Sequence, residues 1–417
     1  MWKFQKEKQP NFKNSKSSGG TKIVSIAHFI YKKFQLIKMK IKTIAFRNVL
    51  TLFFVAMLAS CSNEQHYYLF VGTYTNTSSK GIYVYDFNAA TGDATLVSNT
   101  DSATNPSWVS VSSDQKFVYA VNETNGVNPG RVSAYSFDRA NGTLKFINTT
   151  ASGGDDPCYL ATTSDNKWLT VANYSSGTAA VIPINKDGSL KPYSQLIHDT
   201  IYRDSGSTAT PHVHETVFSP DEKYLVTPDL GLDKLIIYRF DKTKDQPLTL
   251  STPSFVESKK ESGPRHMVFS PNKKFAYLMH ELSGTVTTYQ YADGKFTEIQ
   301  DLPTFPEGTT GRKDGAEINI SPDGKFLYTS DRADLNIITV FSIDATTGKL
   351  AFKGTQSSLG QHPRHFMIDP SGNFLLAANQ DSESIIIFKR DKETGMLSET
   401  GKTIHVPRPV CLQMISK

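Results

Sequence analysis

A motif that recurs roughly every 50 residues constrains this chain more than any other feature. Each copy is a Ser-Pro-Asp turn or an equivalent of it, usually followed by Lys and an aromatic residue. The copies begin at Ser112, Ser164, Ser219, Ser270, Ser321 and Asp369. This period is typical of β-propellers, in which every repeat is one small sheet.

Each repeat predicts four short strands, named a to d from the centre outward. Full units begin near Pro106, Pro157, Pro211, Pro264, Asp314 and Pro363. A strand a is left over at 409–415, and strands b, c and d are left over at 67–73, 81–87 and 94–98. Together these four complete a seventh blade and remove the exposed sheet edge. We therefore predict an all-β, seven-bladed propeller over 67–415; an open β-solenoid, the alternative, would leave the last strand unpaired.

The first 66 residues follow a different pattern. A basic stretch, Met39-Lys40-Ile41-Lys42 with Arg47, precedes an apolar run at 49–58 that is too short to span a bilayer. The run ends in Leu58-Ala59-Ser60-Cys61, which resembles the lipobox of bacterial lipoproteins. We expect a signal peptide at 39–60, acylation of Cys61, a tether at 61–66 and anchoring in the lipid of the bacterial cell envelope. A transmembrane anchor or a cleaved secretory signal is the alternative, and 1–38 is expected to be a non-native or disordered extension.

The charge of the chain is unevenly distributed. Residues 1–60 contain 12 Lys and Arg and one acidic residue, which leaves 33 basic and 39 acidic residues for the rest. The predicted propeller is therefore mildly acidic, which argues against nucleic acid as a partner. Cys158 and Cys411 fall in repeats that are not neighbours, so we expect free thiols.

Ionisable residues gather where the predicted propeller would open. The start of strand a and the end of strand b meet at one mouth of the central channel. The start of strand a supplies His212, His214, Glu215, Arg265, His266, Glu317, Arg364 and His365. The end of strand b supplies Glu123, Asn173, Asp229, Glu281, Asp331, Arg332 and Asn379. This concentration predicts a site for an anionic, oxygen-rich ligand.

Structural roles are the alternative for several of these residues. Glu215 and Glu317 could neutralise the arginines. His266 and His365 share their repeat position with these glutamates, which favours a role between blades. His198 and His405 lie away from the mouth positions and are expected at the surface.

Metal and serine-triad chemistry lack their motifs. The sequence contains no HExxH, no pair of closely spaced cysteines and no G-x-S-x-G. We expect the imidazoles of His212 and His214 to point to opposite faces of a strand, which would make them poor joint ligands. We therefore predict neither a metal nor another cofactor.

Several motifs, in order, resemble one known family. They are Val71-Gly72-Thr73-Tyr74-Thr75, Pro211-His212-Val213-His214, Gly263-Pro264-Arg265-His266, His280-Glu281, Asp314-Gly315-Ala316-Glu317 and Pro363-Arg364-His365. The chain resembles the seven-bladed lactonases, which include propeller-type 6-phosphogluconolactonase and the carboxy-muconate lactonising enzyme. The resemblance covers nearly all of 67–415. It implies a metal-independent site at the channel mouth for a sugar lactone or a related anionic lactone.

The resemblance also implies roles for individual residues. The catalytic set would be Glu281, Arg265 and His212 or His214, with Glu281 or a histidine activating water. Substrate contacts would come from Arg364, Arg332, His266, His365, Glu123 and Asn173. We expect a monomer.

An export signal would carry the protein out of the cytoplasm, where sugar phosphates are metabolised. We therefore expect an unphosphorylated lactone as the substrate. A non-catalytic ligand- or protein-binding propeller at the cell envelope, or a lactonising or isomerase activity on a carboxylated substrate, remain alternatives.

Overall fold

The computed structural model describes residues 29–40 and 65–417. The chain divides into two units, 1–63 and 64–417. Residues 29–40 of the first unit form a helix. Cys61 and most of the predicted signal peptide lie outside the described residues. Within the described residues, we find no helix whose length and apolar character suit a membrane crossing.

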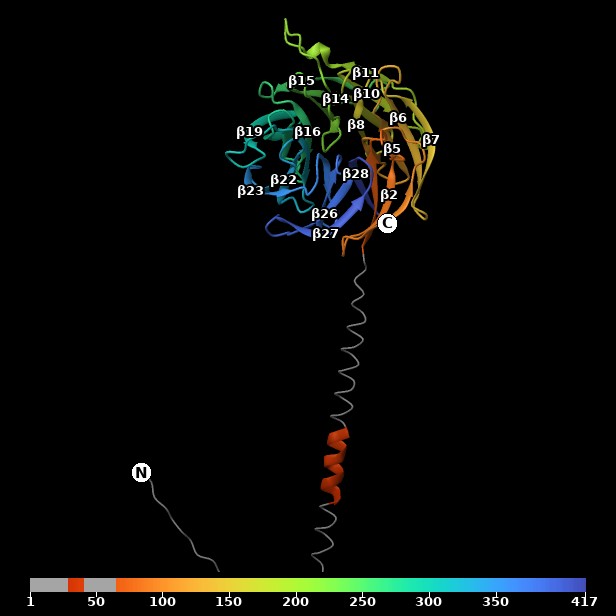
Figure 1. The fold of residues 1–417 in the computed structure, drawn as a ribbon, viewed down its shortest axis with the longest axis vertical. Helices are drawn as coiled ribbons and strands as arrows, with labels where there is room; N and C mark the ends of the chain where they lie inside the picture. The colour runs from red at the N-terminus through yellow and green to blue at the C-terminus, as the bar shows by residue number, and fades with distance from the viewer. Residues whose placement is uncertain (1–28, 41–64) are drawn as a thin grey trace, which may run out of the picture. The chain divides into compact units, whose positions relative to one another are not determined.

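The second unit is a seven-bladed β-propeller, which confirms the predicted fold (Figure 1). Each blade is an antiparallel sheet of four strands whose order in the sheet follows the chain, apart from the blade that joins the two ends.

Blades 1 to 3 comprise these strands: β4 (Val109–Val111), β5 (Phe117–Asn122), β6 (Arg131–Asp138) and β7 (Thr143–Ala151); β8 (Pro157–Thr162), β9 (Trp168–Asn173), β10 (Thr178–Pro183) and β11 (Gln195–His198); β12 (Val217–Phe218), β13 (Tyr224–Asp229), β14 (Lys234–Phe240) and β15 (Leu248–Glu257). A short 3₁₀ helix, η1 (Asp199–Tyr202), follows β11.

Blades 4 to 6 comprise these strands: β16 (Pro264–Phe269), β17 (Phe275–His280), β18 (Thr285–Ala292) and β19 (Lys295–Pro303); β20 (Gly315–Ile320), β21 (Phe326–Asp331), β22 (Ile337–Ile343) and β23 (Leu350–Ser357); β24 (Pro363–Ile368), β25 (Phe374–Asn379), β26 (Ser384–Arg390) and β27 (Leu397–His405).

Blade 7 closes the ring with both ends of the chain. It consists of β28 (Pro409–Ser416), β1 (His66–Thr73), β2 (Tyr83–Asn88) and β3 (Ala94–Asn99), in that order. The register of β28 and β1 runs from Tyr67 opposite Ser416 to Thr73 opposite Pro409. The predicted closure by three strands plus one is therefore confirmed, and the solenoid alternative is wrong.

The recurring turn is a side-chain cap on each hairpin of strands a and b. The capping residues are Ser112, Thr163, Ser219, Ser270, Ser321 and Asp369. In blade 5, for example, Ser321 Oγ accepts the backbone N–H of Phe326 at 3.0 Å and donates to Asp323 at 2.5 Å. A side chain that bonds to nearby backbone stabilises a turn, so these residues are structural.

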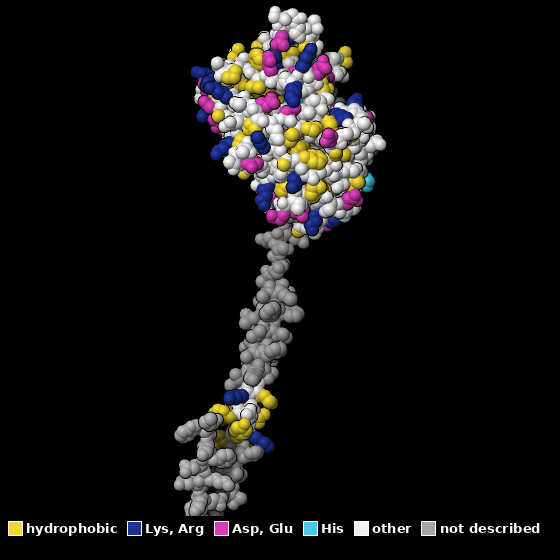
Figure 2. Space-filling view, turned by 90° about the vertical axis from the view of Figure 1, so that its left-hand side faces the viewer, with side chains coloured by type: hydrophobic (Ala, Val, Ile, Leu, Met, Phe, Trp, Pro, Cys, Tyr) yellow, Lys and Arg dark blue, Asp and Glu magenta, His cyan; other side chains and the backbone are white. Residues whose placement is uncertain are grey.

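The core lies between neighbouring blades. Tyr68 and Phe70 of blade 7 pack edge-on against Phe137 of blade 1, and Phe87 packs against Phe374 of blade 6. Full burial of one such side chain stabilises the fold by about 2–3 kcal/mol. Figure 2 shows the outer surface on one side, where hydrophobic, basic and acidic side chains are mixed. The two cysteines of the described residues, Cys158 and Cys411, are free, as predicted, and both are buried.

Candidate functional site

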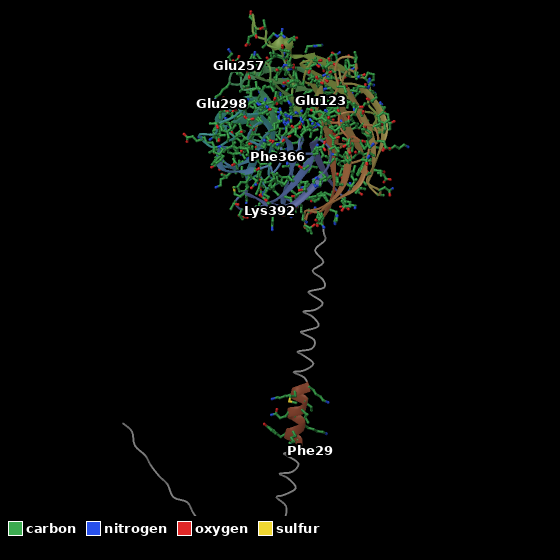
Figure 3. The ribbon with its side chains drawn as sticks, viewed as in Figure 1. Phe29, Glu123, Glu257, Glu298, Phe366 and Lys392 are labelled. Carbon is green, nitrogen blue, oxygen red and sulfur yellow. The ribbon has the colours of Figure 1, made fainter. Side chains whose placement is uncertain are left out.

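The candidate site lies at the channel mouth, where the loops that follow strand b and precede strand a meet. Figure 3 places Glu123 near the centre of the ring, whereas Glu257 and Lys392 lie toward its rim. The residue directly after strand b points into this region in several blades. Glu123, Glu281 and Arg332 each follow such a strand.

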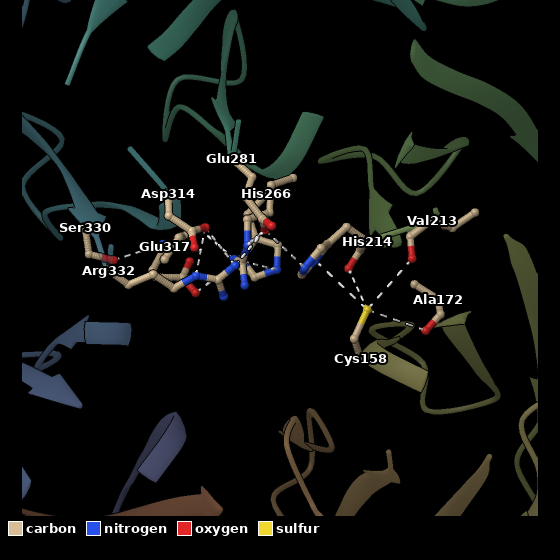
Figure 4. Close-up of polar contacts among 12 residues, drawn as sticks. Cys158, Ala172, Val213, His214, His266, Glu281, Asp314, Glu317, Ser330 and Arg332 are labelled. Carbon is tan, nitrogen blue, oxygen red and sulfur yellow. Dashed lines mark hydrogen bonds and ion pairs between the residues drawn. The ribbon is translucent and has the colours of Figure 1, made fainter. Parts of the chain in front are cut away.

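Glu281 is held by two arginines. Its Oε2 accepts the Nε–H of Arg265 at 2.8 Å and lies 2.9 Å from Nη2 of Arg332 (Figure 4). Arg332 also contacts Asp314 through Nε and Nη2, each at 3.0 Å. Arg265 has 1% of its side chain exposed and donates from Nη1 to the carbonyl of Ala316 at 2.6 Å. The predicted Arg265, Glu281 and Arg332 are therefore brought together in one network.

This network keeps Glu281 negatively charged. Burial alone would raise the pKa of the carboxyl group, but the surrounding guanidinium groups outweigh it and lower the pKa below its ordinary value. Burial and the neighbouring Arg332 lower the pKa of Arg265 to about 10, which leaves this guanidinium charged at neutral pH. Two opposite charges within hydrogen-bonding distance stabilise each other strongly when water is largely excluded.

His212 and His214 lie against the same aromatic ring. Tyr174 stacks on His212 with centroids 4.5 Å apart and meets His214 edge-on at 5.5 Å. The expectation that these histidines point to opposite faces is wrong, because residues two apart in an extended segment share a face. His214 Nε2 lies 3.8 Å from Glu281 Oε2. Burial, together with the nearby arginines, holds the pKa of His214 well below its ordinary value, so this ring is neutral.

The tautomer of His212 follows from its partner. Nδ1 lies 3.0 Å from the backbone carbonyl of Tyr174, which can only accept a hydrogen bond. Nδ1 therefore carries the proton, and a neutral ring has its lone pair on Nε2. The side chain of His212 is half-buried, in contrast to the buried His214.

Among the three arginines of the mouth, Arg364 has the fewest polar contacts. Its guanidinium lies over the ring of Tyr74, 5.6 Å from the centroid. Its side chain makes no hydrogen bond or ion pair with any residue of the described part of the chain. Tyr74 in turn donates to Glu123 Oε1 at 2.8 Å, and Ser107 donates to Glu123 Oε2. Arg364 and Glu123 thus lie at the mouth, as predicted.

A second, deeper layer contains the remaining predicted histidines. Glu317 Oε2 lies 3.3 Å from Nδ1 of His266 and 3.3 Å from Nε2 of His365. Trp108 packs edge-on against both imidazoles. All three polar side chains are buried, so the geometry favours the role between blades over substrate contact for His266 and His365.

The glutamates of this layer do not neutralise the arginines through direct ion pairs. Glu215 accepts the backbone N–H of Met267 at 2.6 Å, whereas Glu317 faces two imidazoles. Burial raises the pKa of Glu317 to about 8 and raises that of Glu215 well above its ordinary value. Burial lowers the pKa of His365 to about 3. At neutral pH this layer is therefore uncharged or nearly so.

Asn173 differs from its predicted role. It is fully buried, and its amide donates to the carbonyl of Ser152 and to Thr178 Oγ1, each at 3.0 Å. Asn122 and Asn379 end strand b in other blades and donate in the same way to the loop before strand a. Asn173 therefore ties two loops together, and the residue of blade 2 that corresponds to Glu281 is Tyr174.

Sequence reasoning also missed Tyr74, Ser107 and Asp314 as members of the site. Tyr174 was missed because the end of strand b was misassigned by one residue in blade 2. Aligning the repeats on their capping residues would have placed Tyr174 beside Glu123 and Glu281. His198 and His405 are exposed, as expected.

Chemically, the mouth combines an ionised carboxylate, three guanidinium groups and two histidines. Donors fixed in a partly desolvated site stabilise negative charge that develops on an oxygen atom. Among the described residues, no group of three or more His, Cys, Asp or Glu side chains is arranged so that it could hold a metal ion.

The comparisons with known proteins decide the family. The model of a family described as "Lactonase, 7-bladed beta-propeller" matches residues 68–414. The chain belongs to the seven-bladed β-propeller lactonases. The 6-phosphogluconolactonase of Bacillus subtilis is 36% identical over 83% of this chain and 97% of that protein. The 6-phosphogluconolactonase of Formosa agariphila is 36% identical over 84% of this chain and 99% of that protein.

A solved structure of another lactonase shows the same likeness in three dimensions. The periplasmic gluconolactonase of Pseudomonas aeruginosa superimposes with a TM-score of 0.79 at 36% identity. The match covers 84% of this lactonase chain and 99% of that protein.

Proposed function

We propose that this chain is a lactone hydrolase that opens the ring of a sugar lactone at the propeller mouth. The observation that carries the proposal is the network of Glu281, Arg265 and Arg332 next to two histidines and the unengaged Arg364. The relatives named as 6-phosphogluconolactonase and gluconolactonase support the same reaction class.

His212 is assigned as the general base. Its Nε2 lone pair takes a proton from water while the water oxygen bonds to the lactone carbonyl carbon. When the tetrahedral intermediate collapses, the bond between this carbon and the ring oxygen breaks. The imidazolium returns its proton to the ring oxygen, and the product is an open-chain hydroxy acid.

The arginines stabilise the negative charge of the intermediate. Arg364 has its guanidinium N–H groups available, and Nη1 of Arg332 is buried without a partner among the described residues. Both can donate to the carbonyl oxygen as it becomes an oxyanion, or to the carboxylate of the product. Glu281 positions Arg265 and Arg332, since its lowered pKa makes it a weak base.

A lactone panel tests the activity. Release of acid from several aldonolactones would be followed at constant pH with the wild-type protein and with Arg364→Ala. We expect turnover by the wild type and a loss of about a hundredfold in kcat/KM for the variant. Asp245→Asn is the control, because Asp245 is exposed in the loop between β14 and β15, at the opposite end of the strands. No turnover of any lactone, together with thermal stabilisation by the lactones, would indicate a binding protein instead.

We also propose that the chain is exported and held at the cell envelope by acylated Cys61. The basic stretch, the apolar run and Leu58-Ala59-Ser60-Cys61 support this location. Labelling with radioactive palmitate in a bacterial host tests it. Label and membrane association should be lost in Cys61→Ala and kept in Ser62→Ala; an unlabelled wild-type protein would contradict the proposal.

A further inference from the structure

A cavity of about 500 Å³ opens at the channel mouth, where Glu123 is one of its lining residues. Blades 7, 1 and 2 form its walls. The lining includes Tyr74, Asn76, Glu123, Asn128, Asp156 and Arg408. Among the described residues, no Val, Leu, Ile, Met or Phe side chain contributes to this lining. The volume falls within the range of small-molecule sites, and the polar walls suit a ligand rich in hydroxyl groups.

The cavity reaches the reacting groups at two points. Tyr74 lines it and also packs under the guanidinium of Arg364. At the other point, the carbonyl of Asp156 accepts the backbone N–H of Tyr174 at 3.0 Å. The ring of Tyr174 stacks on the imidazole of His212. A ligand whose reacting carbonyl lies between Arg364 and His212 can therefore extend its remaining atoms into the cavity.

The walls of the cavity carry more negative than available positive charge. Glu123 and Asp156 contribute two carboxylates. Arg408, the one cation among the described lining residues, lies 3.4 Å from Asp381 outside the cavity and is engaged there.

The charge of the wider mouth is also balanced without a ligand. The mouth contains three guanidinium groups, of Arg265, Arg332 and Arg364, and three carboxylates, of Glu281, Asp314 and Glu123. Arg265 and Arg332 contact Glu281, and Arg332 also contacts Asp314, whereas Arg364 lies over the ring of Tyr74, which donates to Glu123. A phosphate dianion in the cavity would approach two carboxylates, and the described lining residues offer it no cation that is free of an ion pair. Hydroxyl groups of a ligand could instead donate to these carboxylates.

We propose that this space, the polyol cavity, binds the hydroxyl-bearing tail of an unphosphorylated sugar lactone and that Glu123 and Asp156 disfavour a phosphorylated one. The inference rests on the proposed lactonase function and names its substrate class. Asp156 is fixed for this role, because its carboxylate accepts the amide of Asn125 at 2.9 and 3.0 Å and the hydroxyl of Ser175 at 2.5 Å.

The experiment compares glucono-1,5-lactone with its 6-phosphate as probes. We expect the wild-type kcat/KM to favour the unphosphorylated lactone by about tenfold or more. Asp156→Asn keeps the shape of the side chain and removes one charge. It should raise kcat/KM for the phosphate about threefold to tenfold. It should lower kcat/KM for the neutral lactone about threefold to tenfold, because the hydroxyl groups of this substrate lose a charged acceptor. Added salt should narrow the wild-type preference, since it screens charges at an open mouth. Asp245→Asn should leave the preference unchanged.

Each contrary outcome has one meaning. Turnover of the phosphate at least as fast as that of the neutral lactone overturns the polyol cavity and leaves the proposed function intact. An equal loss on both lactones in Asp156→Asn shows that the carboxylate only supports the loops, and this also overturns the selectivity. Turnover of neither lactone by the wild type contradicts the proposed function itself.

Discussion

Glu281 and Glu317 lie in the same channel, yet their pKa values shift in opposite directions. Glu281 faces the guanidinium groups of Arg265 and Arg332, which lower its pKa in spite of burial. Glu317 faces two imidazoles, and burial raises its pKa to about 8. The identity of the neighbours, rather than depth alone, decides which carboxyl group carries a charge at neutral pH.

This difference divides the channel into two layers with separate tasks. The outer layer holds charges that a substrate can reach, and its arginines have unused donors. The inner layer of Glu215, His266, Glu317 and His365 is nearly uncharged and packs against Trp108. A neutral layer can be buried at much lower cost than a charged one, so it can serve as the floor of the site.

The largest effect is expected from Glu281→Gln. Removing the carboxylate leaves Arg265 and Arg332 without their shared partner, so the oxyanion donors lose their positions. We expect kcat/KM to fall about a thousandfold. Thermal stability should fall as well, because Arg265 has 1% of its side chain exposed and would lack a counter-charge. Steady-state kinetics and calorimetry measure both effects. Turnover close to that of the wild type would place the chemistry elsewhere.

The next effect is expected from His212→Asn. The amide of asparagine can still donate to the carbonyl of Tyr174, but it offers no basic nitrogen. We expect kcat to fall about a hundredfold while KM changes by less than about threefold. Added imidazole should restore part of the rate, since His212 is only half-buried. A variant that loses binding without losing kcat would make His212 a substrate contact rather than the base.

A third prediction concerns the inner layer and the pH dependence of stability. Glu317 has a pKa of about 8 in the folded protein against an ordinary value of 4.5, so the folded state retains a proton that the unfolded chain releases. Its contribution to stability is complete below about pH 4.5 and is lost as the pH rises to about 8. The free energy of unfolding should therefore decline over this window by an amount on the order of a few kcal/mol.

Glu317→Gln should remove this part of the decline while leaving kcat/KM within about threefold of wild type, because glutamine resembles the protonated carboxyl group. Denaturant titrations at several pH values measure the slope, with Asp245→Asn as the control. An unchanged slope in Glu317→Gln would show that Glu317 is ionised in the folded protein, and the contrast with Glu281 would disappear.

The smallest effects separate Asn173 from its neighbour Tyr174. Asn173→Ala removes amide hydrogen bonds from a buried site and should cost about 1–3 kcal/mol of stability without changing kcat/KM by more than about twofold. Tyr174→Ala should lower activity instead, because both histidines lose their packing partner; Tyr174→Phe, which keeps the ring, is the matched control. A loss of activity in Asn173→Ala without a loss of stability would instead indicate that Asn173 contacts the substrate.

The fold could be predicted from the sequence because the turn motif depends on nearby residues and recurs along the chain. The turn residues cap hairpins within five positions of themselves, and the leftover strands at the two ends add up to one blade. Placement of Arg265, Glu281, Arg332 and Arg364 at the mouth also follows from the repeat.

The layering of the site could not be predicted in the same way. His266 and Arg265 are adjacent in sequence, yet one faces the inner layer and the other pairs with Glu281. The register at β16 shifts between Pro264 and His266, and this irregularity decides which side chain faces which layer. The same irregularity recurs at the start of strand a in blades 2, 5 and 6, and the alternation of apolar residues alone does not reveal it. Misassigning the end of one strand had a similar effect at Asn173.

The closure of blade 7 has a consequence for the order in which the protein is made. The strand β28 comprises Pro409–Ser416 and is the last strand of the propeller in chain order. Until it emerges, β1 lacks one neighbour and Tyr74 lacks the backbone acceptor that Arg408 supplies at 3.1 Å. The mouth therefore cannot form on a growing chain. A polypeptide that stops before β28 would carry nearly all of the polar side chains of the site and still be inert, so activity requires that synthesis has passed this strand.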